Sequence, residues 1–177
     1  MATIEDINRL IGDIPRKVRE QVPTIIATEA VGYYKERFRK KDWDGQPWKP
    51  AKNPPPRGSL MIRSGQLVNS IHPSRITPGE VVISNEKPYA RIHNEGGTVT
   101  QIPTPKQRRF FWALEHKTNP EAWGEGGKLD LSKTKEWGWA ARAKKLTINI
   151  PQRKFMGHSP ILFDRILDKI HALLNLK

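Results

Sequence analysis

Five histidines are the first residues in this sequence that could bind a metal. They are His72, His93, His116, His158 and His171. Two imidazoles on one helix hold a metal when they lie four residues apart, and no pair here has that spacing. The chain has no cysteine, which excludes disulfides, thiolate metal sites and cysteine nucleophiles. We therefore predict no metal site and no cofactor, and structural positions for the histidines.

Three further patterns that could do chemistry are incomplete. Asp42 and Asp44 precede Gly45 as at the start of a calcium loop, but the third acid and the distal glutamate are missing. The sequence GEGGK at 124–128 lacks the spacing and the hydroxyl residue of a phosphate-binding loop. No serine lies in a G-x-S-x-G elbow. We predict that the protein is not an enzyme; a cell-wall hydrolase, the enzyme alternative, would need paired acids in a cleft.

The charge is strongly positive. Lysine and arginine number 31 against 18 acids, which leaves +13 and a pI near 10.2. Such a surface attracts polyanions, and it suits an acidic protein partner or DNA as well as plain solvation. Arg109 is followed by Phe110, Phe111 and Trp112, aromatics that could stack on bases beside cations that meet phosphates. A basic nucleic-acid-binding module is therefore the alternative function.

Length and apolar periodicity predict the first elements. With 177 residues and 36% apolar content, the chain is sized for one domain with a modest core. Apolar residues recur every three or four positions from Ile4 to Ile25, as on one face of a helix. Pro15 and Pro23 interrupt this stripe, so we predict two helices, at 3–21 and 23–40. No apolar stretch is long enough for a membrane span, and the amino terminus lacks the pattern of a secretory signal.

The remaining elements follow from turn residues and periodicity. We predict an extended loop at 41–58, a short helix within 60–71 capped by Ser64, a hairpin of 71–76 and 80–84, a short helix within 88–97, a helix at 106–116, a strand at 146–150 and a final helix capped by Ser159 with Pro160 at its first position. The predicted fold class is α+β. A small antiparallel sheet packs with the long amino-terminal helical region and the carboxy-terminal helix in a single domain, 1–177, with an irregular tryptophan-rich insertion at about 103–145.

Four stretches, in this order, resemble the virion morphogenesis or tail-completion family of tailed bacteriophages. They are DWDGQPWKP at 42–50, LMIRSGQLVNSI at 60–71, YARIHNEGG at 89–97 and IPQRKFMGHS at 150–159. The resemblance implies a structural protein of a phage or prophage that completes the tail or joins it to the head as a ring of subunits, without catalysis. It implies tail or head–tail connector proteins as partners. The positive charge predicts nonspecific contact with DNA, and the lack of a long apolar stretch predicts no membrane contact. The resemblance also implies a location in the bacterial cytoplasm during assembly and then in the tail or neck of the virion.

Aromatic and arginine side chains in and near these stretches are our candidates for contacts with partners. They are Trp43, Trp48, Arg63, Tyr89, Arg109, Trp112, Arg153 and Phe155. Aromatic side chains anchor loops by apolar burial, and an arginine such as Arg153 clamps a carboxylate or backbone carbonyls. Each aromatic also fits a plain core position, which is the commoner place for large apolar side chains.

Overall fold

The computed structural model describes residues 4–51 and 57–174, except the side chains of 4–14, 17 and 125. The described chain forms two compact units. We call residues 1–96 with 151–177 the terminal unit and residues 97–150 the inserted unit. The insertion predicted at about 103–145 falls inside the inserted unit, while the single domain over 1–177 stays a prediction.

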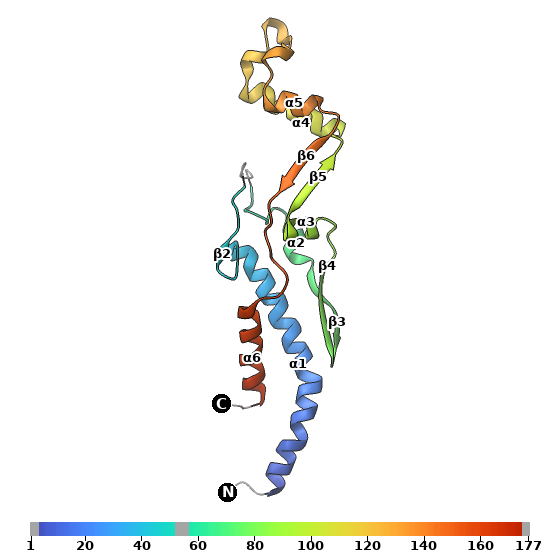
Figure 1. Ribbon diagram of the computed structural model, residues 1–177, viewed down its shortest axis with the longest axis vertical. Coiled ribbons are helices and arrows are strands. Elements are labelled where there is room, and N and C mark those ends of the chain that lie inside the picture. Colours follow the sequence, from blue (N-terminus) through green and yellow to red (C-terminus); the bar gives the residue numbers. More distant parts are fainter. Residues whose placement is uncertain (1–3, 52–56, 175–177) are drawn as a thin grey trace. The chain divides into compact units, whose positions relative to one another are not determined.

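The two units together have the predicted α+β class (Figure 1). The terminal unit contains α1 (Ile4–Lys40), β1 (Asp42–Trp43), β2 (Gln46–Pro47), α2 (Gln66–Asn69), β3 (Ile71–Thr77), β4 (Glu80–Asn85), α3 (Ala90–Glu95) and α6 (Pro160–Leu174). The inserted unit contains β5 (Gly97–Gln101), α4 (Pro105–Thr118), the 3-10 turns η1 (Pro120–Ala122), η2 (Glu125–Gly127) and η3 (Leu131–Lys133), α5 (Glu136–Arg142) and β6 (Leu146–Ile150). The strands pair in three two-stranded antiparallel sheets, β1 with β2, β3 with β4 and β5 with β6.

Helix α1 corrects the prediction of separate helices at 3–21 and 23–40. It runs without a break through Pro15 and Pro23, while Thr3 lies outside the described residues. A proline inside a helix removes one hydrogen bond and crowds the preceding turn, at about 3 kcal/mol. Packing outweighs that cost at the second site, because Pro23 is buried and begins a row of buried positions on α1.

The β3–β4 hairpin confirms the predicted one. Its register runs from Ile71 opposite Asn85 to Thr77 opposite Glu80, with a shift after Pro73, which has no amide proton for the ladder. The predicted cap of the preceding helix is wrong. Helix α2 begins after Gly65, which has a φ of 74° and no side chain to cap with, so Ser64 lies one residue too early.

The loop after α1 is stabilised by one very short hairpin. Strands β1 and β2 pair across Asp44 and Gly45, both with positive φ. This agrees with the predicted extended loop at 41–58, of which residues 52–56 lie outside the described part of the chain. The hairpin turns Trp43 back toward α1, where its ring lies about 6 Å from those of Tyr33 and Tyr34.

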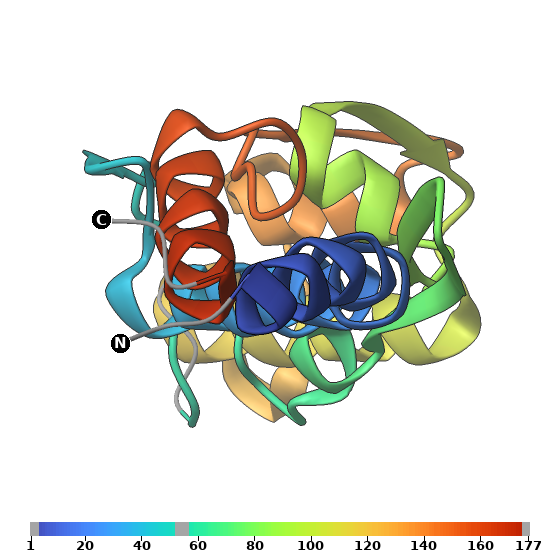
Figure 2. The ribbon, with the colours of Figure 1, turned by 90° about the horizontal axis from the view of Figure 1, so that it is seen from below.

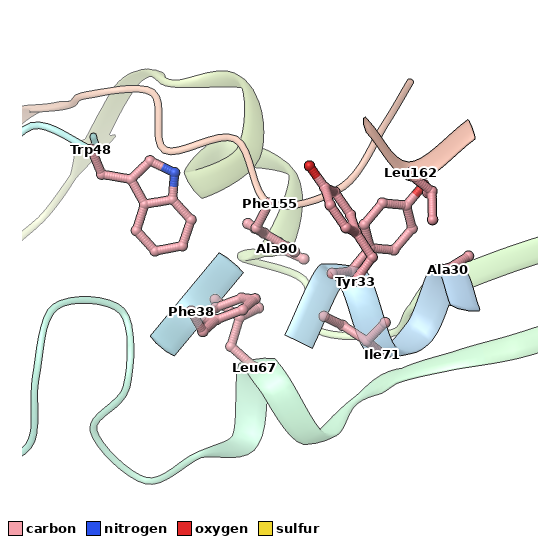
Figure 3. Close-up of a cluster of buried hydrophobic side chains, with 10 residues drawn as sticks. Ala30, Tyr33, Phe38, Trp48, Leu67, Ile71, Ala90, Phe155 and Leu162 are labelled. Atoms are coloured by element: carbon pink, nitrogen blue, oxygen red, sulfur yellow. The ribbon is translucent and has the colours of Figure 1, made fainter. Parts of the chain in front are cut away.

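The core of the terminal unit gathers on one face of α1 (Figure 3). Phe38 is fully buried, and its ring lies 4.9 Å from that of Phe155 and 5.6 Å from that of Trp48. Tyr33, five residues earlier on α1, is 1% exposed. Helix α6 lies beside α1, as Figure 2 shows, and adds Leu162 to this core.

Ser159 begins α6 as predicted and also ties it to the rest of the unit. Its hydroxyl oxygen accepts from the amide of Leu162 at 3.2 Å, and Pro160 occupies the first helical position. The same hydroxyl lies 2.7 Å from Oδ1 of Asp44, which also accepts from the hydroxyl of Tyr33. One carboxylate therefore joins α1, the β1–β2 turn and α6.

The inserted unit contains two predicted elements, and its other elements, β5 and α5 among them, were not predicted. The predicted strand at 146–150 and helix at 106–116 are confirmed as β6 and α4. Helix α4 begins with a capping box between Thr104 and Gln107. Strand β5 was not predicted; it pairs with β6 from Gly97 opposite Ile150 to Gln101 opposite Leu146.

The centre of the inserted unit is a buried carboxylate. Glu115 has no exposed side-chain area and accepts from Nδ2 of Asn119 and from the amides of Lys135 and Gly138, at 2.7 to 2.8 Å. Burial raises the pKa of Glu115, but these hydrogen bonds lower it by more, and the net pKa lies below the ordinary value. The carboxylate thereby holds the start of α5 against α4.

We predict that Glu115→Ala lowers the free energy of unfolding of the inserted unit by about 3 kcal/mol, because buried amides lose a charged acceptor. Hydrogen exchange at Lys135 and Gly138 in the full chain measures the effect. Glu121→Ala, which removes an exposed carboxylate of η1, is the matched control. Unchanged protection of both amides would contradict the role given to Glu115.

A second carboxylate makes stability depend on pH. Glu36 on α1 lies 2.8 Å from Nη1 of Arg165 on α6 and 2.8 Å from Nζ of Lys40. Hydrogen bonds from Arg165 and then Lys40 lower the pKa of Glu36 to about 2. Because the folded-state pKa is depressed, this stabilisation is present above the ordinary glutamate pKa and is lost as the pH falls toward 2.

We predict that Glu36→Gln costs about 2 kcal/mol at neutral pH, a value reduced for partial exposure, and flattens the fall in stability between about pH 4.5 and 2. Urea unfolding at several pH values tests this. Glu80→Gln breaks an exposed pair with Arg75 and should change stability by under about 1 kcal/mol. If both substitutions lowered the free energy of unfolding equally, the larger role given to Glu36 would be wrong.

Candidate functional site

A cavity of about 410 Å³ lies in the terminal unit. We call it the Arg153 pocket. Its apolar, aromatic and basic lining side chains include Leu60, Met61, Arg63, Tyr89, His93 and Arg153. They come from three of the four stretches that carry the family resemblance, and Ala51, next to the end of the fourth, also lines the cavity. Residues that lie far apart in the sequence thus meet at one place.

Backbone contacts of the segment at 150–159 bring these stretches together. The amide of Arg153 donates to the carbonyl of His93 at 2.9 Å. The Asn94 side chain accepts from the amides of Phe155 and Met156, at 2.9 and 3.0 Å. Nε1 of Trp48 donates to the carbonyl of Lys154 at 2.8 Å. The segment is therefore held between α3 and the loop after β2.

Arg153 is the charged group of this pocket. Its side chain is 7% exposed, and Nε and Nη2 donate to the carbonyls of Lys49 and Pro50, at 2.9 and 3.3 Å. Of the two roles predicted for this arginine, the structure shows the clamp on backbone carbonyls. Burial lowers the pKa of Arg153, and no carboxylate of the described residues forms an ion pair with it.

His93 is the titratable neighbour of that charge. Its Nδ1 is buried and has no hydrogen-bond partner among the described residues. Its ring meets that of Tyr89 edge to face at 6.0 Å. Burial, and then the charge of Arg153, lower the pKa of His93, so the imidazole is uncharged at neutral pH. This position was not predicted as a site, although it lies within the YARIHNEGG stretch.

The predicted interaction residues lie in three places: at the pocket, packed inside the terminal unit, and on α4 of the inserted unit. Arg63, Tyr89 and Arg153 meet at the pocket, where Arg63 and Tyr89 are exposed. Trp48 and Phe155 are buried in the core, at 8% and 1% exposure, so they hold loops within this chain.

Trp43 also packs inside the terminal unit. It stacks on Tyr34, and Nζ of Lys154 lies 4.6 Å from the centre of its ring. Its aromatic surface is therefore partly used by neighbours in the same chain.

Arg109 and Trp112 lie in the inserted unit on α4. Arg109 is exposed, whereas Trp112 packs edge to face on Trp123 at 6.3 Å. Phe111 stacks on Trp137, while Phe110 is 59% exposed. Phe110 also lies 6.0 Å from Phe111, so all three aromatics named for base stacking have intramolecular ring contacts. The nucleic-acid alternative stays a prediction.

Comparison with known protein families matches the phage virion morphogenesis family over residues 3–175. The chain belongs to this family. The resemblance noted in the sequence is thereby confirmed, and the family points to a structural role in the phage particle rather than a catalytic one. No curated protein and no solved structure matches the chain. Within residues 4–51 and 57–174, no helix has both the length and the apolar composition needed to cross a membrane.

Gly96 permits a close approach to the residue that precedes Arg153. Its φ is 76°, and an added Cβ would lie 2.7 Å from the amide nitrogen of Gln152. Because that neighbour is backbone, it cannot move aside without displacing Arg153. The end of α3 and the start of the 150–159 segment therefore require glycine here.

We predict that Gly96→Ala lowers the free energy of unfolding by about 2 to 4 kcal/mol through backbone strain and overpacking. Gly32→Ala is the control, because it lies inside α1 with nothing within 4 Å of the new Cβ and should stabilise by up to about 1 kcal/mol. Thermal unfolding of both variants distinguishes them. A neutral effect of Gly96→Ala would show that the segment has room to shift.

Proposed function

We propose that this protein completes the phage tail or joins it to the head, acting as a ring of identical copies. Membership of the virion morphogenesis family supports the general assembly role. The observation that carries self-association is the exposure of Val18, which lies on the apolar stripe that the sequence places along α1.

The stripe extends beyond the core of the terminal unit. Among the described side chains of α1 before Val22, all are exposed, and the first buried one is Pro23. Val18 is 42% exposed, although it continues the apolar spacing that begins at Ile4 in the sequence. Figure 1 shows α1 continuing past the end of the β3–β4 hairpin and past α6. An amphipathic helix gains most of its stability from packing its apolar face, so this stretch suits a partner helix.

Charge explains why the contact between copies must be apolar. Each copy carries +13, so like copies repel one another at long range. Apolar burial is independent of sign and offsets that repulsion over short distances. Added salt screens the repulsion, so self-association should strengthen as the ionic strength rises.

We predict that Val18→Glu weakens self-association at least tenfold, because assembly would bury a charge on the stripe. Thr24→Glu adds the same charge at an exposed position about 120° from Val18 around the helix and is the matched control. Analytical ultracentrifugation and negative-stain microscopy, with and without phage tail tubes, provide the readout. A wild-type chain that stays monomeric and never joins a particle would refute the proposal.

A further inference from the structure

We propose that the Arg153 pocket receives a carboxylate side chain, with adjoining apolar residues, from an acidic partner protein. This inference rests on the proposed assembly role and names the chemistry of one partner. Three features of the cavity support it. They are the buried guanidinium of Arg153, Nδ1 of His93, which has no hydrogen-bond partner among the described residues, and apolar lining side chains.

The first step is the unbalanced charge at the base of the pocket. A guanidinium has five donor hydrogens, and the two hydrogen bonds of Arg153 reach only neutral carbonyls. A buried cation is costly without a counter-ion, and none of the described residues that line the pocket is acidic. An incoming carboxylate supplies the missing charge and accepts the remaining hydrogen bonds.

The second step is the polar group beside that charge. Nδ1 of His93 is buried without a partner, which costs free energy in the unbound protein. His93 lines the cavity, and in the tautomer that carries its hydrogen on Nδ1 this atom is a donor from which an incoming carboxylate oxygen can accept. Arg63, exposed at the same cavity, adds positive charge on the approach.

The third step separates a protein segment from the phosphate backbone of a nucleic acid. Leu60, Met61 and Leu67 line the cavity, so its occupant buries apolar atoms together with its charge. A phosphodiester chain has no apolar side chain to fill this space. An acidic residue flanked by apolar residues would pair with the charge of Arg153 and pack against the apolar lining side chains.

The fourth step selects the source of that segment. A second copy of this chain also carries a net charge of +13, so electrostatic repulsion opposes its approach to the arginines of the pocket. An acidic protein is drawn toward the same surface. We therefore assign the pocket to a different protein of the particle.

Three blocked tripeptides serve as probes of the full-length protein. They are acetyl-Leu-Glu-Leu-amide, its glutamine counterpart and its phosphoserine counterpart. Affinity is measured by nuclear magnetic resonance titration, with the Nε–H signal of Arg153 and the ring signals of His93 and Tyr89 as reporters. We expect the glutamate peptide to bind at least tenfold more tightly than the glutamine peptide and to shift all three reporters.

Two single substitutions locate the binding. Arg63→Gln should weaken the glutamate peptide about three- to tenfold while leaving the fold intact, because Arg63 is exposed. Arg91→Gln removes an equally basic residue of α3 that is 85% exposed and does not line the pocket, so it should leave affinity unchanged.

Equal affinity of the glutamate and glutamine peptides, or shifts that spare Arg153 and His93, would overturn the assignment. Tighter binding of the phosphoserine peptide would assign the pocket to phosphate instead. If the glutamate peptide dissolves wild-type oligomers, the occupant is a second copy. Failure of the proposed ring is seen separately, because Val18→Glu alters self-association without touching the pocket.

Discussion

Burial of one face of α1 is the constraint on which the terminal unit depends. Tyr33 and Phe38 lie five residues apart on α1, and segments from distant parts of the sequence close over them. Trp48 arrives from the loop after α1, while Phe155 and Leu162 arrive from the last quarter of the chain. Rings in edge and tilted contact gain from both burial and geometry. Because the two ends of the sequence meet on this helix face, the inserted unit can leave and rejoin the terminal unit between Gly96 and Pro151.

The same arrangement explains the Arg153 pocket. Anchoring Trp48 and Phe155 in the core fixes the backbone on both sides of Arg153, and its guanidinium then donates to the carbonyls of Lys49 and Pro50. Neutral backbone carbonyls leave the positive charge of a guanidinium uncompensated, whereas a carboxylate partner would balance it. The core aromatics therefore position a cation for which the described residues supply no carboxylate partner.

The buried polar groups of the two units differ in how completely they are hydrogen-bonded. Glu115 is fully buried, and its hydrogen bonds come from Asn119 and the backbone amides at the start of α5, so it is satisfied within the inserted unit. Arg153 and His93 keep unused donors or an unpartnered atom at a cavity. Buried polar groups are normally hydrogen-bonded, and those left incomplete are where an external group gains most. This difference separates a structural carboxylate from a candidate docking site.

Local sequence determined the elements whose signals are short-range: the β3–β4 hairpin from Pro78 and Gly79, the cap of α6 from Ser159 and Pro160, and the strand at 146–150 from its alternation. The order of four motifs was enough to place the chain in its family. Tertiary structure alone decided that α1 passes through Pro15 and Pro23 and that Arg153 meets His93. Helix continuity at Pro23 follows from packing that outweighs the local cost of a proline, and the pocket follows from contacts between residues sixty positions apart. Neither effect is encoded in the spacing of neighbouring residues, because both arise only when distant segments share one core.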